Sequence, residues 1–160
     1  MNKQRGILTG ELAIKLSILI FLLITLIPPI AQLVHSYASA KSVEAYVNEI
    51  IRLSNVNYSE DVLRSRCLSQ TELSMSHLNL DSSFDSIDFT VEYVQHSTMT
   101  NVKPVAIKIT AHFNDSSMLS SVSRFLESNE YSANSMIFYA PLSFRLPDWQ
   151  QLDVATGCIK

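Results

Sequence analysis

Few residues in this 160-residue chain have types and spacing suited to chemistry. Glu11 places a carboxylate at the start of a long apolar run, and Lys15 follows four residues later. An ionised carboxylate within a membrane-spanning helix costs about 3 kcal/mol and is usually retained for a partner. The helical pair with Lys15 contributes only about 0.2–0.5 kcal/mol when it is exposed. Glu11 is therefore expected to meet a cation, either Lys15 or a partner outside the helix.

Motifs for catalysis or cofactor binding do not occur in the sequence. Gly157 is the only glycine after Gly10, so the chain has no phosphate-binding loop, nucleophile elbow or dinucleotide fingerprint. His77, His96 and His112 lack metal-ligand spacing and are expected on the surface or on a sheet. The net charge of −3 gives no electrostatic footprint for phosphate backbones. We expect no enzymatic activity, no metal, no cofactor and no nucleic-acid partner.

The apolar residues are concentrated near the N-terminus, from residue 12 to residue 34. As a helix, this segment rises about 34 Å, enough to cross a hydrocarbon core of about 30 Å. Lys3 and Arg5 precede it, and basic flanks stay in the cytoplasm. All but three of the 12 basic residues and all but one of the 15 acidic residues lie in 41–160. This acidic body is therefore expected outside the cytoplasm.

Cys67 and Cys158 are the two cysteines of the chain. Outside the cytosol, an isolated pair of cysteines usually forms a disulfide. Such a bond would close a long loop, which the chain-entropy model values at roughly 4–5 kcal/mol. Two unpaired thiols are the alternative, and no CxxC or Cys/His spacing indicates metal or redox catalysis.

The first 40 residues allow three interpretations. A secretory signal peptide would be cut after Ala40 and would release a soluble body, but charged residues interrupt the approach to its apolar run. An uncleaved membrane anchor is the second interpretation. In the third, a cut after Gly6 would make Ile7 the new N-terminus and Glu11 its fifth residue, with Pro28 further along the helix.

With these features together, roughly residues 1–55 resemble the type IV pilin-like family. Its prepilins have a short basic leader ending in Gly, then an apolar helix with Glu at the fifth position and often a helix-bending Pro. The sequence around Gly6 and Glu11 looks most like minor pseudopilins of tight-adherence (Tad) systems; minor pilins of type IVa pili and pseudopilins of type II secretion are also similar. Ile7 and Ile20 depart from the Phe and Gly that are common in type IVa pilins.

The resemblance implies that a prepilin peptidase cuts between Gly6 and Ile7. Glu11 would then neutralise the free amine of Ile7 in a neighbouring subunit during assembly. The implied partners are other pilin or pseudopilin subunits, the peptidase, an inner-membrane assembly platform and membrane lipid. The implied location is the bacterial inner membrane, in a single pass with the N-terminus cytoplasmic and the C-terminal domain periplasmic, or extracellular within a pilus.

Pro28 and Pro29 are expected either to bend the helix near residues 25–26 or to end its membrane-spanning part. Beyond them, apolar residues recur at helical spacing from Val43 to Ile51. One long helix should therefore leave the membrane and pack its outer half on the body, to about Asn55. The polar stretch that follows, to about residue 86, has room for a short helix around residues 61–68.

Alternation of apolar and polar residues predicts two strands, over 87–93 and 105–113, joined by a long loop. Asp115 or Ser116 can cap a helix with an apolar face from Met118 to Leu126. Residues 133–146 are extended, with Pro141 at an edge or bulge. The predicted fold class is α+β, an antiparallel sheet packed on the long helix. The predicted divisions are a leader (1–6), a transmembrane and assembly helix (7–34), its outer half (35–56) and a globular domain (57–160).

Overall fold

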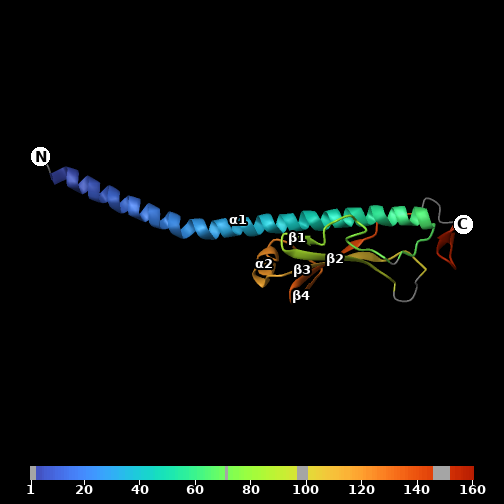
Figure 1. Ribbon diagram of the computed structural model, residues 1–160. Coiled ribbons are helices and arrows are strands. Elements are labelled where there is room, and N and C mark those ends of the chain that lie inside the picture. The colour runs from blue at the N-terminus through green and yellow to red at the C-terminus, as the bar shows by residue number, and fades with distance from the viewer. Residues whose placement is uncertain (1–2, 71, 97–100, 146–151) are drawn as a thin grey trace.

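The computed structural model describes residues 3–70, 72–96, 101–145 and 152–160, with side chains from Gly10 onward. Helix α1 runs from Lys3 to Ser65, a length of 63 residues, or about 95 Å at the usual rise. Figure 1 shows it as a rod whose C-terminal half lies along a small body while its N-terminal half projects alone. The long apolar helix on an antiparallel sheet confirms the α+β class.

Helix α1 ends later than the sequence predicts. It continues past Asn55 to Ser65, so the separate short helix expected around 61–68 is the end of α1 itself. Tyr58 and Val62 explain the continuation, because they extend the buried stripe of the helix and are fully buried against the body. Arg66 then takes a left-handed conformation (φ 58°) and donates its N–H to the Val62 carbonyl at 2.8 Å, which caps the helix.

The buried stripe of α1 recurs every three or four residues, the spacing of one helix face. Its members are Ala40, Val43, Val47, Ile50, Ser54, Tyr58 and Val62. Asn55 fixes the rotation of the helix on the body, since its side-chain oxygen accepts from the Ser143 N–H at 2.9 Å and from the Ser143 hydroxyl at 3.0 Å. The outer half of α1 is thus part of the hydrophobic core.

A five-stranded antiparallel sheet has the order β1-β2-β3-β5-β4. The strands are β1 (Ser83–Phe84), β2 (Ile87–Val94), β3 (Ala106–Phe113), β4 (Glu130–Ser132) and β5 (Ser135–Pro141). The long strands β2 and β3 confirm the two strands predicted from alternation. Pro141 is the last residue of the interior strand β5, beyond the stretch that β4 pairs, so no neighbour on that side needs its missing N–H.

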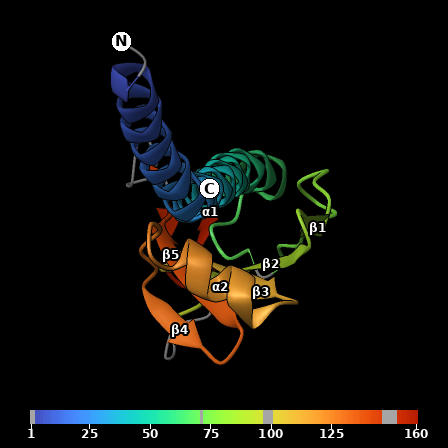
Figure 2. The ribbon, with the colours of Figure 1, turned by 90° about the vertical axis from the view of Figure 1, so that its left-hand side faces the viewer.

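The register of the sheet places one set of side chains toward α1. Phe89, Ala111 and Met136 are aligned across β2, β3 and β5 and are buried. The opposite face is open and polar, with Lys108 and Glu92 paired at 2.7 Å. The domain therefore has two layers, α1 on one side and the sheet on the other, and Figure 2 shows them end-on. The two residues between β1 and β2, Asp85 and Ser86, both have positive φ, as a tight two-residue hairpin requires.

Helix α2 (Ser116–Val122) begins at the predicted cap, because the Asp115 carboxylate accepts from the Ser117 N–H at 2.8 Å. Val122 and Leu126 are buried. In Figure 1, α2 lies at the end of the body nearest the bare half of α1. A small hairpin of β6 (Leu152–Asp153) and β7 (Cys158–Ile159) lies at the other end.

Candidate functional site

The N-terminal half of α1 is the most unusual surface of the molecule. Every large apolar side chain from Leu12 to Val34 is 47% to 67% exposed. Large contiguous apolar surfaces on proteins mark contacts with a membrane or another protein. Within the described residues, α1 is the helix long and apolar enough to cross a membrane, and it lies near the N-terminus.

Glu11 projects from this exposed N-terminal half of α1, called the bare rod below, and pairs with Lys15. Their Oε1 and Nζ atoms lie 2.7 Å apart, one helical turn along, and the two side chains are 61% and 73% exposed. In water such a pair contributes at most about 0.5 kcal/mol. Gly6 and Ile7 lie on the same helix, about 6 Å before Glu11 along the axis. The structure therefore brings Glu11 together with Lys15, the local partner expected from the spacing.

Pro28 and Pro29 lie inside α1, which continues well beyond them, so they do not end the helix. They cannot donate to the carbonyls of the preceding turn. The Thr25 hydroxyl donates back to the Phe21 carbonyl at 2.9 Å, a bond that also tends to bend helices. Figures 1 and 2 show that the axis of α1 changes direction within its blue part.

The bare rod meets the body at a cleft between α1 and the end of α2. The cleft has a volume of about 750 Å³ and is lined by Gln32, His35 and Ser36 of α1 and by Ser121, Arg124 and Phe125. The ring of Tyr37 meets the ring of Phe125 edge-on, with centroids 5.7 Å apart. The spacing of apolar residues predicts Phe125 only as part of an apolar helix face. No sequence motif indicates the cleft, because its two walls are almost 90 residues apart in the chain.

The segment that a signal peptidase would have to cut lies inside the packed helix. Ala40 is 2% exposed and Val43 is fully buried, both in the hydrophobic core. Lys41 pairs with Glu44 at 2.6 Å on the exposed side. The hydrogen bond that Lys41 donates to Glu44 and the negative charge of Glu44 raise the pKa of Lys41. Cleavage after Ala40 would remove one core residue and the turn before it.

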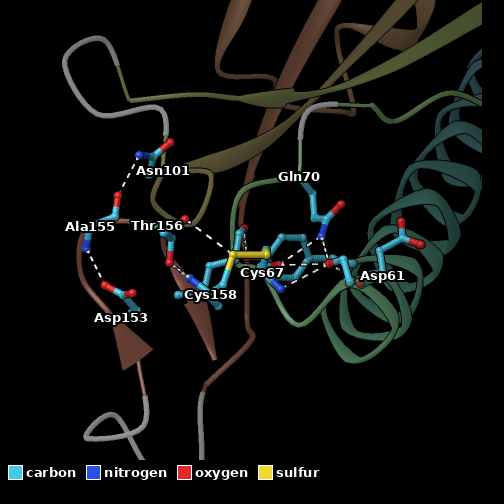
Figure 3. The surroundings of a disulfide bond; sticks show 11 residues. Asp61, Cys67, Gln70, Asn101, Asp153, Ala155, Thr156 and Cys158 are labelled. Carbon is cyan, nitrogen blue, oxygen red and sulfur yellow. Dashed lines mark hydrogen bonds between the residues drawn. A yellow bond between two sulfur atoms is a disulfide. The ribbon is translucent and has the colours of Figure 1, made fainter. Parts of the chain in front are cut away.

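Cys67 and Cys158 form a disulfide, which confirms the predicted pair (Figure 3). The two residues face each other in an antiparallel bridge. Two backbone hydrogen bonds flank it, from Leu68 to Gly157 at 2.9 Å and from Ile159 to Arg66 at 2.6 Å. Neither cysteine is free. The bond therefore joins the segment just after α1 to the β6–β7 hairpin near the end of the chain.

Gly157 lets the hairpin approach the loop after β2. Its φ is +68°, a conformation that favours glycine, and a Cβ there would lie 1.7 Å from the Asn101 carbonyl oxygen. The Asn101 side chain in turn donates to the Ala155 carbonyl at 3.0 Å. Figure 3 shows the hydrogen bond between Asn101 and Ala155 beside the disulfide.

Two buried tyrosines lie between α1 and the sheet. The Tyr58 hydroxyl donates to the Leu68 carbonyl at 2.6 Å, and its ring meets that of Tyr93 edge-on at 5.7 Å. Burial raises the pKa of Tyr58 and of Tyr93, and the charge of Asp61 raises that of Tyr93 further. Both tyrosines are neutral over the physiological range and act in packing.

The histidines predicted on the surface or the sheet lie there. His77 is exposed in the turn before β1, and His112 on the open sheet face has its Nδ1 atom 2.9 Å from the Ser135 hydroxyl. Among the residues for which side chains are described, no group of three His, Cys, Asp or Glu could hold a metal ion.

The geometry thus divides the candidate site into three parts along one helix: an apolar rod carrying a single acid, a cleft where the rod meets the body, and a disulfide at the far end. Comparison with protein-family models, curated proteins and solved structures finds no match to this chain.

Proposed function

We propose that this chain is a minor pilin or pseudopilin, cut after Gly6 and incorporated through α1 into a type IV pilus-like filament or the complex that initiates one. The observation that carries the proposal is one continuous helix with two unlike halves. The first half is apolar and bare, and the second half forms the core of an α+β domain. Such a subunit can pack rod against rod while its body stays outside the bundle.

The length of the helix before its prolines fits membrane insertion before assembly. From Ile7 to Pro28 the helix rises about 33 Å, close to the hydrocarbon thickness of about 30 Å. The basic residues Lys3 and Arg5 favour a cytoplasmic N-terminus. The disulfide supports a body in an oxidising compartment, since disulfides are rare in the cytosol.

Glu11 has the chemistry of an assembly contact. Its only partner among the described residues is Lys15, in an exposed pair that stabilises little. Cleavage after Gly6 creates a second cation, the amine of Ile7. Between subunits, that amine can pair with Glu11 of a neighbour and lower the cost of placing the acid among apolar helices. The chain then acts by assembly and performs no catalysis.

The N-terminal residue of the mature protein tests the proposal. End sequencing or intact mass should give Ile7. A start at Lys41 would identify a secreted domain instead, and an uncut Met1 would leave a membrane anchor or scaffold. Either of these results would refute processing after Gly6.

A pair of matched substitutions then tests the role of Glu11. Glu11→Gln removes the charge and keeps the shape, whereas Lys15→Gln removes only the local partner. We expect Glu11→Gln to be cut and inserted but absent from filaments or tip complexes, and Lys15→Gln to assemble. If both variants fail to assemble to the same extent, assembly depends on the pair within the helix. If both assemble, Glu11 has no role in assembly.

A further inference from the structure

The cleft between α1 and the end of α2 lies where the proposed membrane-spanning segment ends. Its α1 wall runs from Pro29 to Ser36, a rise of about 10 Å. Counted from Ile7, a hydrocarbon core of about 30 Å ends near Pro28. The wall therefore covers the last turns of the exposed apolar run, to Val34, and continues into the headgroup layer, which adds roughly 5–8 Å on each side of the core. The body is therefore seated on the membrane surface with α2 at headgroup depth. This placement rests on the proposed function, which requires α1 to insert.

The side chains of the cleft match the chemistry of a phospholipid headgroup. Arg124 is exposed and makes no hydrogen bond or ion pair with the rest of the described chain. Its guanidinium presents a fork of donors that fits phosphate oxygens. Tyr37, whose ring contacts Phe125, is of a residue type that is enriched at membrane interfaces.

Arg124 is the one arginine or lysine among the residues that line the cleft. Lys41, the next basic residue along α1, is engaged by Glu44 at 2.6 Å. Asp85 lines a separate hollow of about 310 Å³ and is absent from the lining of the cleft. The cleft thus presents an arginine, polar groups from Gln32 and Ser121, and the ring of Phe125.

We infer that this cleft binds the headgroup of an anionic phospholipid in the leaflet on the side of the body, with Arg124 on the phosphate. The lipid holds α2 against the membrane surface before assembly. When the helix leaves the bilayer for a filament, the site must release its lipid, so lipid binding and assembly compete for the same end of the body.

The test uses the full chain in phosphatidylcholine nanodiscs with and without phosphatidylglycerol. Spin-labelled lipids report the preference for phosphatidylglycerol, and hydrogen exchange reports the protection of residues 12–28 and 116–126. Arg124→Gln should lower the preference about fivefold, which corresponds to about 1 kcal/mol for one basic residue at an anionic surface. It should also speed exchange in 116–126. Arg64→Gln is the matched control, an exposed arginine at the far end of α1 that should change neither measurement.

Each outcome decides the inference. If residues 12–28 are protected but Arg124→Gln changes nothing, the lipid site is refuted while the proposed function stands. Rapid exchange of 12–28 in nanodiscs would overturn both, because α1 would not span the bilayer. An Arg124 effect that appears only at several chains per nanodisc would assign the cleft to a second copy and refute the lipid site. A mature start other than Ile7 with an intact Arg124 effect would refute the proposed function alone.

Discussion

Replacement of both cysteines should expose how much of the stability depends on the disulfide. The Cys67→Ser/Cys158→Ser variant removes the bond and leaves no unpaired thiol. The bond closes a loop with a sequence separation of 91 residues, which contains the whole five-stranded sheet. In the chain-entropy model, closing a loop of that length lowers the free energy of the folded state, relative to the unfolded state, by about 4–5 kcal/mol.

That magnitude is large beside the total stability of a small domain, about 5–15 kcal/mol. With an m-value of about 1–3 kcal/mol/M, loss of the disulfide should lower the urea midpoint by at least about 1.5 M. Near-ultraviolet circular dichroism of the full chain in detergent is the suitable signal. It reports the packing of aromatic side chains such as Tyr58 and Tyr93 in the body and receives little signal from the apolar half of α1, where Phe21 is the one aromatic residue between 12 and 34.

Wild-type protein unfolded in the presence of dithiothreitol is the control, since it lacks the bond without any substitution. The reduced protein and the double variant should have the same midpoint. A midpoint within about 0.3 M of the oxidised protein, equivalent to less than about 1 kcal/mol, would refute the loop-closure argument. The backbone bonds that flank the bridge would then hold the hairpin by themselves.

Three further predictions concern the body. Tyr58→Phe leaves the buried Leu68 carbonyl without its donor, so the free energy of unfolding should fall by about 1–3 kcal/mol in urea titrations, and an unchanged value would disprove the role of that bond. Because burial raises the pKa of Tyr58 and Tyr93 in the folded state, their contribution is fully present below the unfolded value of about 10 and is lost as the pH rises through the raised folded values; urea midpoints should fall steadily above about pH 10, and a flat profile would contradict this. Gly157→Ala places a methyl group on the Asn101 carbonyl, so the disulfide should be reduced faster by dithiothreitol, and an unchanged reduction rate would show that the hairpin adjusts without cost.

The predictable parts of the fold are those where one period dominates. Strands β2 and β3 were predictable because apolar and polar residues alternate along Ile87–Val94 and again along Ala106–Phe113. The end of α1 was not, because polar residues surround Tyr58 and Val62 and hide the helical stripe. Between α1 and β1, Leu73 is among several buried residues of a segment that has no regular period.

The candidate site was predictable only where its chemistry is local. The spacing from Gly6 to Glu11 and the pair with Lys15 are matters of a few residues on one helix. The disulfide followed from the compartment that the basic head implies. The cleft at Arg124 depends on how a seven-residue helix docks on α1, a tertiary contact that leaves no local pattern in the sequence.

The position of the disulfide decides how the protein carries mechanical load. Cys67 lies two residues beyond the end of α1, and Cys158 lies on the last strand, β7. A pull between the N-terminal part of α1 and the chain after Cys158 therefore passes along the helix and across the covalent bond. Residues 68–157, which include the whole sheet, are left outside this path. A subunit held by its rod under tension would keep its sheet folded as long as α1 and that one bond hold.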